Sequence, residues 1–164
     1  MLPSALSPKL ILGTAQLGQY YGVANTTGRP DQQSANDIVR CALDGGISLF
    51  DTAQGYGESE AVLGHALGCH DFERSAKVIT KLPPVPPESK SDFQERITQS
   101  LSRLGISHFH CLMLHREDHI PLLDGELGKW LRALREQGTT SHLGVSVDTP
   151  DAATAIIRLK HPHP

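Results

Sequence analysis

The 164-residue chain has few cysteines and no recognisable secretory signal. Its three cysteines, Cys41, Cys69 and Cys111, do not follow the spacing of a metal motif, and an odd number would leave one thiol unpaired in a secreted disulfide scaffold. The N-terminus MLPSALSPKL lacks the charged segment and the apolar segment of a signal peptide. We therefore interpret the cysteines as reduced thiols of the core and expect a cytoplasmic protein.

Long apolar runs and clusters of positive charge are also missing. No stretch approaches the ~20 apolar residues that cross a bilayer. The formal net charge is −3, and no group of lysines and arginines forms the basic patch that binds nucleic acid or an anionic membrane. We therefore expect no nucleic acid and no membrane as partner. With 38% hydrophobic and 20% charged residues, the composition is that of one globular domain with a core.

Short apolar runs alternate with helical patterns, which is typical of the α/β fold class with a parallel sheet. We predict strands at 9–13, 47–51, 77–80, 109–114 and 143–147. We predict helices at 32–43, 59–67 and 127–137, a helix with the apolar stripe Phe93, Ile97, Leu101 and Leu104, and a last helix with Thr149 as cap and Pro150 at its first position. The sequence thus predicts about five β/α units, fewer than a closed eight-stranded barrel of about 250 residues contains.

Ionisable side chains stand at the ends of three of these strands. The run ISLF leads to Asp51, the run KVIT to Lys81 and the run HCLML to His115, while Tyr56 follows Asp51 in the glycine-lined loop FDTAQGYGESE. In a parallel barrel the carboxyl ends of the strands carry the chemistry. We therefore expect these four groups to converge at one mouth.

The four residue types suit the reduction of a carbonyl group. Tyrosine has an ordinary pKa near 10, so it donates a proton best when a cation such as Lys81 stabilises the phenolate. Asp51 would hold that lysine charged, and His115 would donate a hydrogen bond that orients the carbonyl oxygen. A nicotinamide would supply the hydride.

Five stretches resemble the N-terminal portion of the aldo-keto reductase family: LGTAQLG from Leu12, FDTAQGYGESEAVLGHAL from Phe50, VITKL from Val78, LMLHR from Leu112 and LGVS from Leu143. The resemblance implies a (β/α)8 TIM-barrel fold, truncated to about five β/α units, so that residues 1–164 would form a partial barrel domain without strands six to eight. It also implies an NADP-dependent oxidoreductase, with NADPH as cofactor, that reduces a small aldehyde or ketone to an alcohol.

The same resemblance implies particular site residues. The catalytic tetrad falls on Asp51, Tyr56, Lys81 and His115, and cofactor contacts fall on Gly13, Thr14 and Ser146. Val147 stands where many members have asparagine. The phosphate-binding loops of such barrels follow strands seven and eight, so we expect the catalytic corner to be present and the cofactor site to be incomplete. The open barrel edges lead us to expect self-association as well.

Two other functions stay open at this point. One is a Schiff-base aldolase with Lys81 as nucleophile, although a neighbouring Asp51 would keep the amine charged. The other is a non-catalytic truncated barrel, acting as an interaction module or left as a gene remnant, which the ending HPHP favours. His108 and His110 share one strand face, but no Cys, Asp or Glu stands at ligand spacing, so we predict no metal site.

Overall fold

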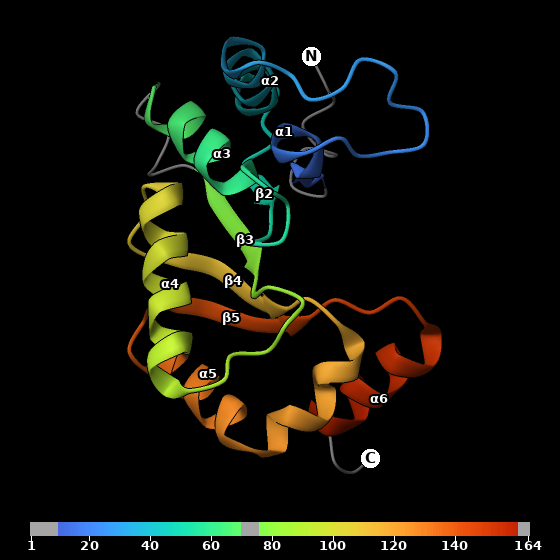
Figure 1. The fold of residues 1–164 in the computed structure, drawn as a ribbon, viewed down its shortest axis with the longest axis vertical. Helices are drawn as coiled ribbons and strands as arrows, with labels where there is room; N and C mark the ends of the chain where they lie inside the picture. Colours follow the sequence, from blue (N-terminus) through green and yellow to red (C-terminus); the bar gives the residue numbers. More distant parts are fainter. Residues whose placement is uncertain (1–9, 70–75, 161–164) are drawn as a thin grey trace.

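A five-stranded parallel sheet forms the centre of the structure, a computed structural model that describes residues 10–69 and 76–160. Its strands are β1 (Leu12–Gly13), β2 (Leu49–Asp51), β3 (Lys77–Lys81), β4 (Phe109–Leu114) and β5 (Thr140–Val145), and they lie side by side in chain order. All four pairings are parallel. The predicted parallel α/β sheet is therefore confirmed (Figure 1).

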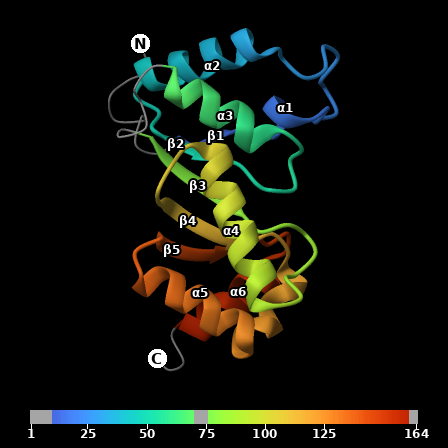
Figure 2. The same cartoon turned by 60° about the vertical axis from the view of Figure 1, so that its left-hand side comes forward.

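Helices connect the strands. They are α1 (Ala15–Gly18), α2 (Gln32–Asp44), α3 (Ser59–Gly68), α4 (Lys90–Leu104), α5 (Glu126–Glu136) and α6 (Pro150–Lys160), and a 3-10 helix, η3, spans Glu117–Asp124. Figures 1 and 2 show α3, α4 and α5 on the same face of the sheet. In the part of the chain that the structure describes, no helix is both long and apolar enough to cross a membrane.

The hydrophobic core lies between the sheet and these helices. It includes Phe50 and Leu112 from the strands, Leu63 and Leu67 from α3, and Phe93 and Leu104 from α4, none more than 2% exposed. Full burial of one such side chain stabilises a fold by about 1.5–3 kcal/mol. The predicted apolar stripe on α4 is confirmed: Phe93, Ile97 and Leu104 are buried, and Leu101 packs against the core.

Capping residues set the start of α2 and both ends of α4. The Asp31 carboxylate accepts a hydrogen bond from the backbone N–H of Ser34 at 2.7 Å, so α2 begins where the sequence predicts. Ser89 caps α4 through the N–H of Asp92 at 3.1 Å, and Gly105 ends that helix in the left-handed region at φ +66°.

Both outer strands differ from the prediction. Leu10 and Ile11 lie outside β1 and are 40% and 50% exposed, while Lys9 lies outside the described residues. β5 starts three residues early and ends two residues early, because its pairing with β4 already begins opposite Phe109. Among the described residues, β1 and β5 each pair with a single strand, so both are edges. Self-association through these edges stays a prediction.

The interpretation of the cysteines as core thiols is wrong for two of them. Cys41 and Cys69 are exposed, and Cys111 is half-buried. The buried side of α2 carries Ala35, Val39 and Ala42, which turns Cys41 toward solvent.

Candidate active site

The strand register brings the carboxyl ends of the strands to one edge of the sheet. Gly13 pairs with Asp51, Lys81 pairs with Met113, and Leu114 pairs with Val145. The side chains that follow these positions therefore share one end of the sheet, as the sequence predicts for a catalytic mouth.

A partly buried ion pair joins β2 to β3 at this end. The Lys81 side chain is 6% exposed, and its Nζ donates to Asp51 Oδ1 at 2.6 Å and to the Thr52 carbonyl oxygen at 3.0 Å. An ammonium group loses most of its hydration in such a place, and a carboxylate with a second acceptor offsets that cost. The pair fixes the position of the Lys81 amine within the site.

Tyr56 and His115 lie against this ion pair. Lys81 Nζ stands 4.9 Å from the centroid of the Tyr56 ring, within the range of a cation–π contact. The Tyr56 and His115 rings meet edge to face, with centroids 5.4 Å apart and planes at 87°. All four residues predicted from the sequence are thus gathered in one cluster, which we call the tetrad.

The environment of His115 favours the neutral imidazole. Burial of the ring, and next the positive charge of Lys81, lower the pKa of His115 below its ordinary value; the Leu82 carbonyl and Asp51 act more weakly in the opposite direction. Within the described residues, His115 Nδ1 is buried without a hydrogen-bond partner. A neutral imidazole carries one N–H donor, which can serve a carbonyl oxygen.

A pH titration should reveal this environment. Because the pKa of His115 is lower in the fold, the unfolded chain takes up the proton first as pH falls below about 6.5. Stability should therefore decline below that pH, and the His115 ring signals in an NMR titration should move only at lower pH. A midpoint at or above the ordinary value would contradict the described burial.

The three predicted cofactor contacts differ in their availability. Gly13 is exposed, and a Cβ added there would meet no atom within 4 Å, so open space lies beside Asp51. The Thr14 hydroxyl is instead buried and donates to the Asp51 carbonyl oxygen at 2.9 Å. Ser146 is half-exposed, and its backbone N–H donates to the Leu114 carbonyl oxygen at 2.9 Å, next to His115.

Ser59 and Glu60 support this end of the sheet, and the sequence interpretation gave them no such role. Ser59 Oγ donates to the Thr14 carbonyl oxygen at 2.7 Å and lies 3.0 Å from the Thr52 hydroxyl. Buried Glu60 accepts hydrogen bonds from Thr80 at 2.7 Å, from Ser100 and from Arg103. The threonines at the strand ends were the available signal, but only the packing shows that Thr52 meets Ser59 and that Thr80 meets Glu60.

Gly18 holds the Tyr56 loop close to α1. A Cβ on Gly18 would lie 1.9 Å from the Tyr56 carbonyl oxygen and 2.2 Å from the Ser59 backbone nitrogen. Both atoms are backbone atoms, so the loop itself would have to move.

Gly18→Ala should therefore destabilise the chain by about 1–3 kcal/mol, the usual cost of forced overpacking. The measurement is urea unfolding, with Gly13→Ala as control because its added Cβ has open space. Equal stability of the two variants would show that the Tyr56 loop does not need this close approach.

Comparison with known proteins agrees with the fold and the motifs. The sequence profile of the Aldo/keto reductase family matches residues 9–163. The chain is 33% identical over 135 residues to a 6-dehydroglucose reductase of Novosphingobium aromaticivorans, covering 74% of this chain and 44% of that protein. It is 30% identical over 151 residues to a D-arabinose 1-dehydrogenase of Saccharomyces cerevisiae, covering 87% of this chain and 43% of that one.

Solved structures show the same relationship. A Klebsiella pneumoniae aldo/keto reductase, solved in complex with NADP and acetate, matches with a TM-score of 0.67 and 26% identity over 90% of this chain and 49% of its own. The chain thus spans about half of that structure and less than half of the two curated relatives. From the profile match, the five parallel strands and these likenesses together, we conclude that the chain belongs to the aldo/keto reductase family.

Proposed function

We propose that the chain carries the catalytic part of an NAD(P)H-dependent carbonyl reductase, which converts an aldehyde or ketone to an alcohol. The single observation that carries this proposal is the ion pair of partly exposed Asp51 with buried Lys81, whose amine lies against the Tyr56 ring. Family membership and the NADP complex of the Klebsiella relative support the choice of cofactor.

In this proposal each residue of the tetrad has one task. The Tyr56 hydroxyl gives its proton to the carbonyl oxygen, and the Lys81 ammonium stabilises the phenolate that remains. Asp51 compensates the charge of Lys81, and the N–H of His115 orients the carbonyl oxygen. The nicotinamide supplies the hydride that the carbonyl carbon accepts, so it is oxidised as the carbonyl is reduced.

The described residues fit the nicotinamide end of the cofactor. The open space at Gly13 lies beside Asp51, and half-exposed Ser146 follows β5 next to His115. Thr14 is fully buried, and its hydroxyl, its backbone N–H and its carbonyl oxygen are all hydrogen-bonded inside the protein, so it would support this end of the sheet rather than offer a free group to the cofactor. In TIM barrels the phosphates are held by loops after strands seven and eight. Residues 1–164 would therefore form a partial barrel domain that needs further groups to bind the phosphates of the cofactor.

NADPH titration tests whether this chain holds only the nicotinamide end of the cofactor and needs further groups for the phosphates. We expect the chain alone to bind NADPH weakly in a calorimeter. The C-terminal half of the Novosphingobium relative can be added as a separate polypeptide, and we call the complex of the two pieces the completed barrel. NADPH should bind to the completed barrel at least about tenfold more tightly than to the chain alone, a difference of 1.4 kcal/mol. Equal affinity of the chain alone and of the completed barrel would contradict the need for further groups. An absence of NADPH binding to a folded completed barrel would favour the non-catalytic alternative.

Borohydride treatment addresses the aldolase alternative. A Schiff-base enzyme treated with a carbonyl compound and borohydride gains a stable adduct on its lysine. We expect no adduct on Lys81, because its amine is already bonded to Asp51 and to the Thr52 carbonyl. Mass-spectrometric detection of such an adduct would overturn the reductase proposal.

A further inference from the structure

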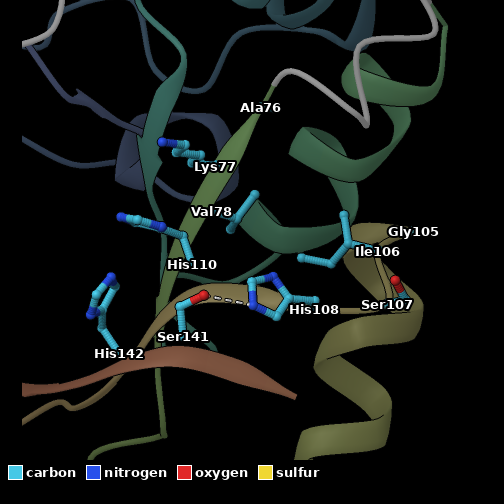
Figure 3. Close-up of a pocket in the computed structure, with 10 residues that line it drawn as sticks. All are labelled: Ala76, Lys77, Val78, Gly105, Ile106, Ser107, His108, His110, Ser141 and His142. Carbon is cyan, nitrogen blue, oxygen red and sulfur yellow. Dashed lines mark hydrogen bonds between the residues drawn. The ribbon is translucent and has the colours of Figure 1, made fainter. Parts of the chain in front are cut away.

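A second cavity lies at the opposite end of the sheet from the tetrad. It has a volume of about 850 Å³ and opens at the amino ends of β3, β4 and β5. Its polar lining includes Lys77, His108, His110, Ser141 and His142 (Figure 3). We call it the amino-end cavity. The mechanism proposed above makes no use of it.

The lining of the amino-end cavity is basic, although the chain as a whole is acidic. Three of the nine histidines and one lysine line it, and within residues 10–69 and 76–160 no acidic side chain does, while the chain carries a net charge of −3. Among the ion pairs of the described residues, none involves these four side chains. Their charge is thus uncompensated by a neighbouring carboxylate in the described part of the chain.

The groups are near enough to act together. The His110 and His142 rings have centroids 5.0 Å apart at 74°, and His108 Nε2 lies 2.9 Å from the Ser141 hydroxyl. Figure 3 shows the ends of Lys77, His110 and His142 projecting to the same side. Lys77 and His142 are exposed and His110 is half-buried, so a solute can reach all three.

We propose that the amino-end cavity binds a small, doubly charged oxyanion of the phosphate type, held by the Lys77 ammonium and by N–H groups of His110 and His142. Hydrogen bonds from cationic donors to such oxygens are short and strong. Three donor groups that come from three neighbouring strands, without a competing carboxylate among the described lining residues, meet the chemical needs of such a ligand.

Binding should take up protons. Burial lowers the pKa of His110, and the positive charges of His142, Lys77 and His108 lower it further. These groups face His110 from β3, from β5 and from the residue just before β4. A bound dianion reverses their effect and favours the protonated ring, so affinity should rise as pH falls through the range in which imidazoles titrate, near 6.5.

Sulfate is the probe for the first experiment, because its charge stays constant over the range in which histidines titrate. Calorimetric titration of the chain should show saturable binding that is at least about tenfold tighter near pH 5.5 than near pH 8. Lys77→Met and His142→Gln should each weaken binding near pH 5.5 by about tenfold or more, since each removes a charged hydrogen bond. His65→Gln is the matched control, because His65 is exposed on α3.

Clear outcomes would overturn the proposal. They are an absence of saturable sulfate binding, an affinity that does not change with pH, and an equal loss of sulfate affinity in Lys77→Met and His65→Gln.

Binding of Zn²⁺ in place of sulfate would also overturn the proposal and would assign the imidazoles of His110 and His142 to a metal. Inorganic phosphate and methyl phosphate then separate the two sources of the ligand: tighter binding of the ester supports a phosphorylated compound, and tighter binding of the free ion supports inorganic phosphate. None of these measurements uses NADPH or a carbonyl compound, so they are independent of the proposed function.

Discussion

Replacing Tyr56 with phenylalanine should lower carbonyl reduction by the completed barrel about 10²–10⁴-fold, the range expected when a general acid is removed. The substitution removes one hydroxyl and keeps the ring that packs against His115 and Lys81. NADPH affinity and folding should therefore be nearly unchanged. The measurement is the rate of NADPH oxidation with a panel of aldehydes, beside calorimetric titration of the cofactor.

Tyr21→Phe is the matched control for this prediction. Tyr21 is 55% exposed in the loop that follows α1, and it has no place in the proposed mechanism. We expect Tyr21→Phe to leave the rate of NADPH oxidation by the completed barrel unaltered. Retained turnover in Tyr56→Phe, with the control also active, would remove the general-acid role from Tyr56.

Lys81→Met should impair both catalysis and stability. The loss of a charge that stabilises the transition state typically lowers the rate about 10²–10³-fold. The same change leaves the Asp51 carboxylate, whose side chain is 30% exposed, without its cation. We expect unfolding to become easier by about 1–3 kcal/mol, less than for a fully buried pair because water still reaches Asp51.

A double substitution separates these two effects. Asp51→Asn in the Lys81→Met background removes the unpaired carboxylate, so most of the lost stability should return, while activity should not. Lys129→Met serves as the control in urea unfolding. Lys129 pairs with Glu126 at 2.6 Å with both side chains 65% exposed, and such surface pairs contribute little. If Lys81→Met were no more harmful to stability than Lys129→Met, the ion pair would not hold the site together.

The sequence predicts that the residues of the tetrad lie close together because of how a parallel sheet is built. A short buried strand reads as a mostly apolar run, and its carboxyl end is marked by a charged residue, as at Asp51 and Lys81. Parallel register then places such residues at one edge whatever the details of each loop. Tyr56 was predicted from its place in the glycine-lined loop after Asp51, although no periodicity specifies the path of that loop.

Other features depend on contacts between distant segments. The Glu60 carboxylate is buried because Ser100 and Arg103 on α4 come within hydrogen-bond distance, and nothing in the string GYGESE shows that. Gly18 is needed because the Tyr56 loop passes beside it. The extent of β5 was set by pairing with β4 rather than by its apolar residues, so its predicted bounds were shifted.

The most direct test of the proposed function follows the hydride itself. The completed barrel and its Tyr56→Phe variant would be incubated with an aldehyde and with NADPH that carries deuterium at the nicotinamide C4, and the alcohol would be analysed by mass spectrometry. We expect deuterium on the former carbonyl carbon with the unaltered chain and a nearly complete loss of labelled alcohol with the variant. Equal labelling by both proteins, or none by a completed barrel that binds NADPH, would contradict it.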